Sequence, residues 1–509
     1  MEDLPLGKSD TGGPDRPSRV DHLFRDIARR HATQIALSWN GGRLTYAELD
    51  QLSDRLSMKL ITAGAKEGEY IAVSLERREQ AVLAMLAILK SGAAYVSLDP
   101  RDDHDQAARL SEIAGVRRVI RKSDRQDISD LSVEHFNCEG TRVDTAVDPH
   151  EHELSKVDPI ACLMLTSGTT AGRKAVMVPH RGVVRLVVGQ DYAELGPTAV
   201  VLQLAPLTFD ASTFEIWGAL LTGGRLVAYP RSAVDAGFMH KLIESEKINT
   251  LWLTAGLFHT LARHRADQFR DLRTLVTGGD VVRPDFVEKV FEACPNLKIV
   301  NGYGPTENTT FTCCHVMSAG ERLGHSVPIG RPIVGTTVFV LDTNMHAVAP
   351  GEDGELYCGG LGVARGYLGE PELTAQRFVA APWNAQETLY RTGDRVRALN
   401  DGTLIFLGRY DDQAKVRGYR VVLGEIERVL RSMDGIEEAV VELVRNDSGN
   451  RLIAHVQPRG PAVFDASGIR EFARARLPHY AVPDVFKMVN ALELTQTGKL
   501  KRKYDAATS

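Results

Sequence analysis

The segment LTSGTTAGRKAV (165–176) decides between two unrelated ways of binding phosphate, and with them between two folds. Its hydroxyl side chains and two glycines lead into Arg173 and Lys174, a composition typical of loops that bind phosphate. A Walker P-loop requires G-x-x-x-x-G-K-[ST] between a strand and a helix. Here the second glycine comes one residue early, Arg173 separates it from Lys174, and Ala175 replaces the hydroxyl residue.

The residues after this loop also argue against a P-loop. AVMV, directly before Pro179, is strand-like, so no helix N-terminus is at hand to bind a phosphate. Ser167 lacks the G-x-S-x-G context of a serine nucleophile. We therefore predict a flexible flap between two strands that grips phosphate oxygens with hydroxyl and amide groups. An ordinary polar turn is the alternative.

The gross composition excludes several classes of protein. A chain of 509 residues should hold two to four domains or subdomains. Its net charge is -5, whereas proteins that bind a nucleic-acid backbone show a basic excess. The most apolar segment, AVLAMLAIL (81–89), has roughly half the length of a membrane span, so it predicts a packed helix.

The N-terminus and the cysteines indicate the compartment. Residues 1–18 lack the apolar core of a signal peptide, and their Gly, Pro, Asp and Ser content predicts a disordered tail. No CxxC pair occurs. The sequence therefore predicts a cytoplasmic protein without a zinc site, in which the thiols stay reduced. The cysteines are Cys138, Cys162, Cys294, Cys313, Cys314 and Cys358.

The order of helical and strand-like patterns predicts an α/β protein. Residues 20–150 and again 240–303 alternate helical segments with short apolar strands, which indicates two doubly wound, largely parallel sheets. From about 325 to 407, short β-rich runs with Gly and Pro turns indicate a β-barrel-like subdomain. We predict an N-terminal core over 19–409, a hinge at 410–412 and a small mobile α+β lid domain over 413–509.

The opening loop resembles the T-S-G-T-T-G-x-P-K-G signature of the adenylate-forming superfamily. This superfamily includes acyl-CoA synthetases, luciferases and the adenylation domains of nonribosomal peptide synthetases. FDAS (209–212) and LKSGAAYVSLDP (89–100) resemble the amino-acid-activating adenylation domains most closely. Further matching segments follow in the expected order: LTYAEL (45–50), FDASTFEIWGALL (209–221), NGYGPTEN (301–308), GELYCGGLGVARGYLG (354–369), YRTGDRVR (390–397), GRYDDQAKVRGYRVVLGEIE (408–427) and LTQTGKLKRK (494–503).

The resemblance implies a reaction in two halves. An amino-acid carboxylate attacks the α-phosphate of ATP and gives aminoacyl-AMP and pyrophosphate. The acyl group then passes to the phosphopantetheine thiol of a carrier protein, and a small activator protein is an open further partner. Because one anion attacks another, the site needs concentrated positive charge and rigid positioning. ATP and Mg²⁺ are the cofactors implied.

The resemblance also assigns catalytic roles. Lys499 spans the substrate carboxylate, the α-phosphate and the ribose. Glu307 holds Mg²⁺, which favours one or two carboxylates plus phosphate oxygens, and Thr306 reaches the phosphates. Asp411 falls at the hinge. A thiol tunnel is lined by Lys415, Arg417 and Gly418 once the lid rotates.

In the nucleotide site that the resemblance implies, Tyr303 stacks on adenine, Asp394 accepts from both ribose hydroxyls, and Arg409 contacts ribose or phosphate. Gly279 and Asp280 lie along the adenine. The full set is Thr166, Ser167, Gly168, Thr169, Thr170, Lys174, Gly279, Asp280, Asn301, Tyr303, Gly304, Asp394 and Arg409.

The resemblance also assigns the residues of the amino-acid pocket, one position at a time. Asp210 takes the place of the aspartate that binds the α-ammonium group, and a buried carboxylate needs such a cation. The side-chain pocket comprises Ala211, Phe214, Trp252, Val276, Gly278, Gly302, Thr310 and Phe311. Leu253 is an alternative to Trp252. These uncharged, bulky walls predict a small branched aliphatic substrate, with valine first and 2-aminobutyrate and isoleucine open.

Some positions depart from the superfamily pattern. Ala171, Gly172 and Arg173 stand where Gly, a variable residue and Pro are usual, and Ala175 replaces Gly. Lys501 stands where many relatives have Asp. None of these changes removes a group that the chemistry requires.

Three hypotheses follow from the sequence. The first is an amino-acid:carrier-protein ligase. The second, an acyl- or aryl-CoA ligase, should lack Asp210, and the third, a non-catalytic binding relative, should lack Glu307 or Lys499. No carrier-protein or condensation motif occurs in the sequence. A free-standing enzyme that loads a separate carrier is therefore expected, with an excised domain as the alternative.

Overall fold

The computed structural model describes most of the chain. The described residues are 19–76, 79–100, 115–122, 131–136, 142–143, 158–166, 174–231, 233–324, 326–410, 413–416, 419–446, 449–459 and 466–489. The predicted tail over 1–18 lies outside them, and Tyr410 is the part of the predicted hinge that they include.

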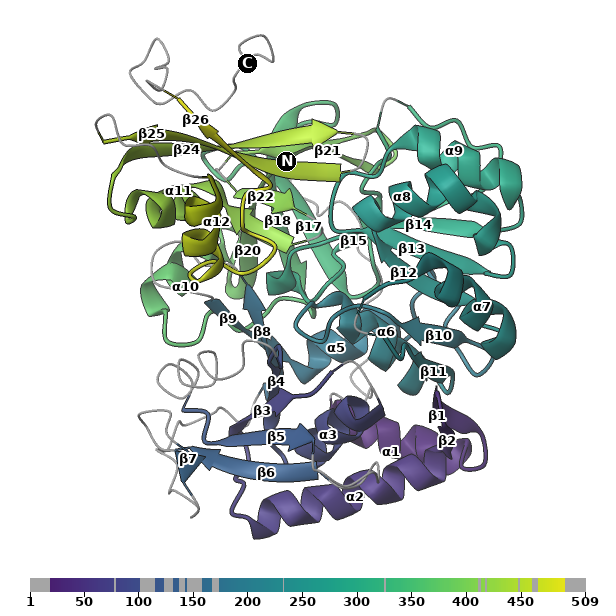
Figure 1. The fold of residues 1–509 in the computed structure, drawn as a ribbon. Coiled ribbons are helices and arrows are strands. Elements are labelled where there is room, and N and C mark those ends of the chain that lie inside the picture. The colour runs from purple at the N-terminus through teal and green to yellow at the C-terminus, as the bar shows by residue number, and fades with distance from the viewer. Residues whose placement is uncertain are drawn as a thin grey trace.

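A twisted sheet of mostly parallel strands forms the centre of the molecule (Figure 1). Every pairing from β14 to β1 is parallel, and antiparallel strands close both edges. The strand order is β16 (Arg331–Pro332), β15 (Cys313–Met317), β14 (Lys298–Tyr303), β13 (Thr274–Gly278), β12 (Thr250–Thr254), β10 (Val200–Gln203), β11 (Arg225–Ala228), β1 (Ile35–Trp39) and β2 (Gly42–Thr45).

A second sheet lies nearer the N-terminus and has the same design. Its middle strands β5, β3, β4 and β8 pair in parallel, and its edges are antiparallel. The strand order is β7 (Arg142–Val143), β6 (Leu131–Phe136), β5 (Arg118–Lys122), β3 (Tyr70–Ser74), β4 (Ala94–Ser97), β8 (Ile160–Thr166) and β9 (Lys174–Pro179).

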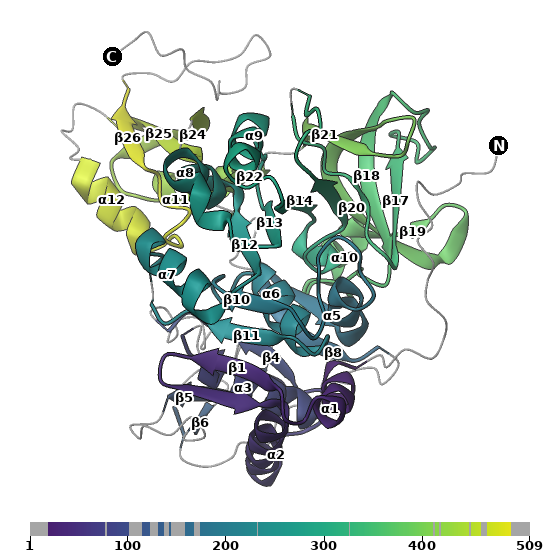
Figure 2. The same ribbon diagram turned by 90° about the vertical axis from the view of Figure 1, so that its right-hand side faces the viewer.

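Helices share one apolar core with strands of both sheets, and α1 and α2 lie at the end of the molecule that holds the N-terminal sheet (Figure 2). All residues of helix α6 are buried, as expected of a helix between two layers, and its one charged side chain, Glu215, accepts hydrogen bonds from the backbone of Leu204 and Ala205. The apolar segment 81–89 lies in α3 and is buried, as predicted. The helices of this core are α1 (Val20–Arg30), α2 (Tyr46–Thr62), α3 (Glu79–Lys90), α5 (His180–Val187) and α6 (Ala211–Leu220).

The opposite face of the central sheet carries a second core. Its helices are α7 (Ala236–Glu246), α8 (Ala255–Arg265), α9 (Pro284–Ala293) and the short η1 (Ala266–Phe269). Because helices cover both faces, the parallel strands are buried on both sides. None of the described helices is long and apolar enough to cross a membrane.

The β-rich region is an open sheet, and the prediction of a barrel-like subdomain is wrong in this respect. Strand β20 is long enough to pair with β18 on one edge and with both β19 and β21 on the other, which extends the sheet without closing it. Helix α10 (Pro371–Arg377) precedes β19. The strands are β17 (Thr336–Leu341), β18 (Asp353–Gly360), β20 (Asn384–Ala398), β19 (Phe378–Ala381) and β21 (Leu404–Arg409).

The C-terminal part of the described chain has an apolar core of its own. A two-stranded hairpin leads into a three-stranded sheet that packs on two helices, in the α+β arrangement that the sequence predicts. The elements are β22 (Gln413–Val416), β23 (Tyr419–Val422), α11 (Leu423–Arg431), β24 (Ile436–Asn446), β25 (Gly449–Pro458), α12 (Ala466–Arg474) and β26 (Val485–Met488).

Trp217 of α6 tests the packing between the two main sheets. Its side chain is fully buried, and its Nε1 donates a hydrogen bond to the Tyr95 hydroxyl of β4 at 3.2 Å. We expect Trp217→Ala to lower the free energy of unfolding by about 3–5 kcal/mol, because it opens a cavity between the layers. Urea unfolding followed by circular dichroism measures this. The exposed Met58→Ala on α2 is the control and should change stability by less than about 0.5 kcal/mol.

Candidate active site

The central parallel strands bring the predicted pocket residues together at their carboxyl ends. Trp252 pairs with Val276 across β12 and β13, and Gly278 pairs with Gly302 across β13 and β14. In an open α/β sheet, ligands bind beyond this edge. Trp252 belongs to the core on the α6 side, whereas Leu253 belongs to the opposite core, so the register favours Trp252 as the pocket residue.

Two glycines keep this edge open. A Cβ atom on Gly278 would lie 2.0 Å from the Gly302 carbonyl oxygen, and one on Gly302 would lie 2.8 Å from Cε1 of Phe311. Neither position can hold a larger residue unless the strand ends or the Phe311 ring move. We therefore expect the two glycines to form the floor of the predicted pocket, across which Phe311 reaches.

Asp210 joins the amino-acid side of the site to the phosphate side. It lies directly before α6, and its Oδ2 accepts a hydrogen bond from Thr306 Oγ1 at 2.6 Å. Its backbone oxygen accepts from Thr310 Oγ1 at 3.0 Å. Residues predicted for three separate tasks thus lie in direct contact.

Aromatic rings form the walls around this point. The ring centroids of Phe214 and Phe311 are 5.4 Å apart, and that of Tyr192 is 5.8 Å from Phe311. The ring centroids of Phe209 and Trp252 are also 5.4 Å apart. Sequence analysis missed Phe209 and Tyr192. The position of Phe209, directly before Asp210, is the signal that could have found it.

Glu307 lies on the short helix η2 (Thr306–Asn308) and is almost completely buried. Its Oε1 accepts a hydrogen bond from the Tyr367 hydroxyl at 2.6 Å. Lys174 Nζ lies 5.3 Å from the centroid of the Tyr367 ring, a cation–π contact. The single residue Tyr367, which sequence analysis did not select, therefore links the predicted metal ligand to the predicted phosphate flap.

The flap itself is described at its two ends. Thr166 ends β8 and pairs with Lys174, which begins β9, so the loop joins two antiparallel strands as the sequence predicts. Burial raises the pKa of Glu425 in α11 to about 7, although Lys174 nearby acts to lower it. The C-terminal part of the chain therefore approaches the flap.

The predicted ribose site forms one hydrogen-bonded group. The Tyr303 hydroxyl donates to Asp394 Oδ2, and Arg409 donates from Nη1 to Asp394 Oδ1 and from Nη2 to the Thr392 carbonyl. Burial, and then the Asp394 carboxylate, raise the pKa of Tyr303, which keeps its hydroxyl protonated. The three residues predicted to bind the nucleoside thus lie together.

The other nucleotide residues have specific local partners. Gly279 has a φ of +76°, a conformation that favours glycine, and it presents Asp280. Asp280 Oδ2 accepts from Asn450 Nδ2 of β25 at 2.5 Å. Asn301 donates to the Pro328 carbonyl at 2.8 Å. A Cβ on Gly304 would lie 2.3 Å from the Thr310 carbonyl oxygen.

Several predicted residues lie outside the part of the chain that the structure describes, and for these the assignments stay predictions. Lys415 belongs to β22, but its side chain is among those left undescribed. The residues outside the described ranges are Ser167, Gly168, Thr169, Thr170, Asp411, Arg417, Gly418 and Lys499.

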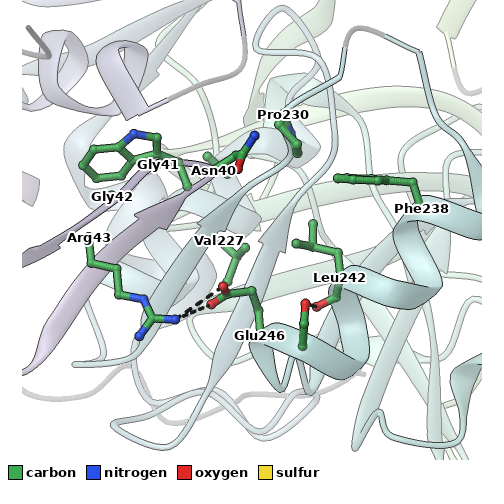
Figure 3. Close-up of a pocket in the computed structure, with 12 residues that line it drawn as sticks. Asn40, Gly41, Gly42, Arg43, Val227, Pro230, Phe238, Leu242 and Glu246 are labelled. Atoms are coloured by element: carbon green, nitrogen blue, oxygen red, sulfur yellow. Dashed lines mark hydrogen bonds and ion pairs between the residues drawn. The ribbon is translucent and has the colours of Figure 1, made fainter.

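A separate hollow of about 660 Å³ lies beside the turn between β1 and β2 (Figure 3). Val227, Phe238 and Leu242 give it an apolar wall, and Arg43 pairs with Glu246 at 3.5 Å on its rim. None of the predicted site residues lines it.

Five described cysteines are free and buried. Burial raises the pKa of Cys162 to about 12 and also raises that of Cys313, Cys314 and Cys358. Thiols of this kind are poor nucleophiles at neutral pH.

Comparison with known proteins identifies the family. The model of the AMP-binding enzyme family matches residues 24–368, and that of the AMP-binding enzyme C-terminal domain matches residues 425–499. The chain belongs to the AMP-binding enzymes. AMP-forming ligase chemistry and the use of ATP follow from this membership.

The relatives of this AMP-binding enzyme are large synthetases. Gramicidin S synthase 2 of Brevibacillus brevis is 35% identical over 488 residues, which cover 95% of this chain and 11% of that protein. Surfactin synthase subunit 2 of Bacillus subtilis (strain 168) is 38% identical over 490 residues, with 95% and 14% covered. The chain therefore spans only a small part of these curated relatives.

A solved structure supports the same assignment as these relatives. Holo-PA1221, an NRPS protein containing adenylation and PCP domains bound to a vinylsulfonamide inhibitor, matches with a TM-score of 0.84 and 33% identity over 95% of this chain and 83% of that chain. The predicted branch, the amino-acid-activating adenylation domains of nonribosomal peptide synthetases, is confirmed. The predicted α/β fold with a large N-terminal and a smaller C-terminal part is confirmed as well.

Gly278→Ala tests the glycine floor. The new methyl group would meet the Gly302 carbonyl, so we expect a loss of stability of about 1–3 kcal/mol and a fall in ATP–pyrophosphate exchange of about 100-fold, because the strand ends carry the substrate. Gly256→Ala on α8, where a Cβ meets nothing within 4 Å, is the control. Unchanged exchange in Gly278→Ala would contradict the role of this edge.

Proposed function

We propose that this AMP-binding enzyme activates a small branched aliphatic α-amino acid to its aminoacyl-AMP, with release of pyrophosphate. Valine is the expected substrate, with 2-aminobutyrate and isoleucine as neighbours. The enzyme then transfers the aminoacyl group to the phosphopantetheine thiol of a separate carrier protein. The observation that carries this proposal is the Asp210 carboxylate, set among uncharged pocket residues and fixed by Thr306.

Asp210 supports an amino-acid substrate by its charge. The Thr306 hydroxyl donates to one carboxylate oxygen at 2.6 Å and so orients the group. A partly buried carboxylate is stabilised by a cation within reach, and an α-ammonium group supplies one. The substrates of an acyl- or aryl-CoA ligase, the second candidate, carry no α-ammonium group. The presence of Asp210 therefore disfavours this class of enzyme.

The pocket walls support a small apolar side chain. Phe214, Phe311 and Trp252 are buried and take up volume. The Thr310 hydroxyl already donates to the Asp210 carbonyl, which leaves the Trp252 indole as the hydrogen-bonding side chain of the wall. A strongly polar substrate would keep most of its groups unpaired there, while one methylene more or less changes binding by only about 1–3 kcal/mol.

Glu307 suits a magnesium ion. Its carboxylate oxygens are hard ligands of the kind that Mg²⁺ takes together with phosphate oxygens, and the hydrogen bond from Tyr367 holds the group in one orientation. When bound, the ion would neutralise phosphate charge. Because Glu307 is present and fixed, a non-catalytic relative is disfavoured.

The remaining groups would position the nucleotide. Asp394, held by Arg409 and Tyr303, would accept from the ribose hydroxyls, and Lys174 would grip phosphate from the end of the flap. Lys499 would neutralise the charge between carboxylate and α-phosphate. A cytoplasmic location is part of the proposal, supported by the free thiols of the described cysteines.

A substrate scan tests the proposal. ATP–pyrophosphate exchange is measured with the twenty amino acids, 2-aminobutyrate and isovalerate, which is valine's close analogue without the ammonium group. We expect valine to give the highest rate and isovalerate none, because Asp210 would be left without its cation. Exchange with isovalerate and not with valine would favour the CoA-ligase alternative. No exchange with any aliphatic amino acid would overturn the pocket assignment.

Lys499→Ala tests the catalytic lysine. Loss of a positive charge placed between the two reacting anions should lower the exchange rate about 100-fold or more. Lys501→Ala, two residues away, is the matched control and should behave like the unaltered enzyme. Full activity of Lys499→Ala in adenylation would show that the lysine has been assigned wrongly.

A further inference from the structure

Arg185 is a buried cation flanked by apolar residues on a short helix. It lies on α5, in the sequence HRGVVRLV, and only 4% of it is exposed. Its Nη1 donates to the Phe311 carbonyl at 2.7 Å and to Thr336 Oγ1 at 2.9 Å. Its Nη2 donates to the carbonyls of Asn308 at 2.6 Å and Thr309 at 3.2 Å. The guanidinium thus bonds three carbonyls of one short turn.

Burial of this charge is unfavourable. Burial lowers the pKa of Arg185 to about 10, and none of the ion pairs among the described residues includes it. Carbonyl and hydroxyl oxygens take the place of a carboxylate. A buried charge of this kind needs hydrogen bonds to be tolerated. The turn over 308–311 supplies most of those made by the two Nη atoms, while Nε has no hydrogen-bond partner among the described residues.

The turn that Arg185 binds is strained. Thr309 has a φ of +49° and Thr310 a φ of +69°, so two consecutive β-branched residues adopt the left-handed conformation. Such residues rarely do so, and strain of this kind persists only when the surroundings enforce it. Arg185 holds the carbonyl oxygens on both sides of the pair.

Two glycines make room for this arrangement. A Cβ on Gly362 would lie 2.0 Å from Nη2 of Arg185, and one on Gly182 would lie 2.5 Å from Thr309 Oγ1. Thr309 Oγ1 in turn donates to the Gly362 carbonyl at 2.7 Å. Helix α5 and the segment around Gly362 therefore form a cage that fits the turn and the guanidinium together.

The same turn carries residues of both halves of the site. Glu307 precedes it, Thr310 bonds the Asp210 carbonyl, and the Phe311 ring forms a wall of the pocket. We propose that Arg185 is a positioning residue that holds this turn in its strained form and so sets the width of the amino-acid pocket. This inference rests on the proposed function, because it concerns selectivity among the acids that the enzyme activates.

Arg185→Lys is the direct test. Lysine keeps the charge but lacks the planar fork that reaches several carbonyls at once. We expect the KM for the best amino acid to rise about tenfold, which corresponds to about 1.4 kcal/mol. We also expect the preference for the best over the second-best amino acid to shrink, and the KM for ATP to change much less.

Arg181→Lys is the matched control, one turn earlier on the same helix. Arg181 pairs with Asp158 at 3.1 Å and donates to the carbonyls of Leu361 and Val363, so it holds the segment around Gly362 but none of the carbonyls of the turn. Its substitution should leave selectivity unchanged. A loss of selectivity in Arg181→Lys equal to that in Arg185→Lys would overturn the proposal, because any disturbance of α5 would then suffice.

Gly362→Ala keeps the test decisive if Arg185→Lys fails to fold. It leaves Arg185 in the chain but pushes the guanidinium away from the turn, so the same loss of selectivity is expected. If Arg185→Lys and Gly362→Ala both fold, melt near the temperature of the unaltered enzyme and keep its KM and selectivity, the proposal is overturned. Selectivity is measured as the preference between the two amino acids that the unaltered enzyme uses best. If neither of them is valine, the proposed function is contradicted, but this test of Arg185 still applies.

Discussion

The site depends on one short contact, the hydrogen bond from Thr306 Oγ1 to Asp210 Oδ2 at 2.6 Å. Asp210 stands at the start of α6, and Thr306 begins η2 after the central strand β14. Adenylation requires a carboxylate and a phosphate to meet, so the group that anchors the amino acid must lie at a fixed place relative to those that bind phosphate. In the proposed site, this bond fixes that place by joining two residues that are 96 positions apart.

The sequence predicted what depends on local pattern. The strand after the phosphate loop excluded a P-loop, and β8 and β9 do pair from Thr166 to Lys174. The choice between Trp252 and Leu253 stayed open in the sequence, and the pairing of Trp252 with Val276 in the structure favours Trp252. Strand period is a property of short segments, which is why the flap between two strands could be inferred without a structure, whereas the register needed the pairing itself.

Long-range contacts could not be predicted in this way. Tyr367 reaches Glu307 from sixty positions away, and Arg185 reaches Phe311 across 126. The barrel-like subdomain was predicted from the density of short strands, but closure depends on which edges meet, and β20 has two partners on one edge. Arg185, which is flanked by apolar residues in HRGVVRLV, was a visible signal, because a buried cation needs partners from elsewhere in the fold.

Three carboxylates lie where the polyanion ATP and the carboxylate of the amino acid are proposed to bind, so their own negative charges must be balanced. Arg409 balances Asp394 before any ligand arrives. Glu307 is oriented by the neutral Tyr367 hydroxyl, and Asp210 by the neutral Thr306 hydroxyl. The proposal assigns Glu307 to a metal ion and Asp210 to an α-ammonium group. Under that proposal, a substrate without an ammonium group would bring only its carboxylate towards Asp210, so the residue that attracts an amino acid would repel a simple acid.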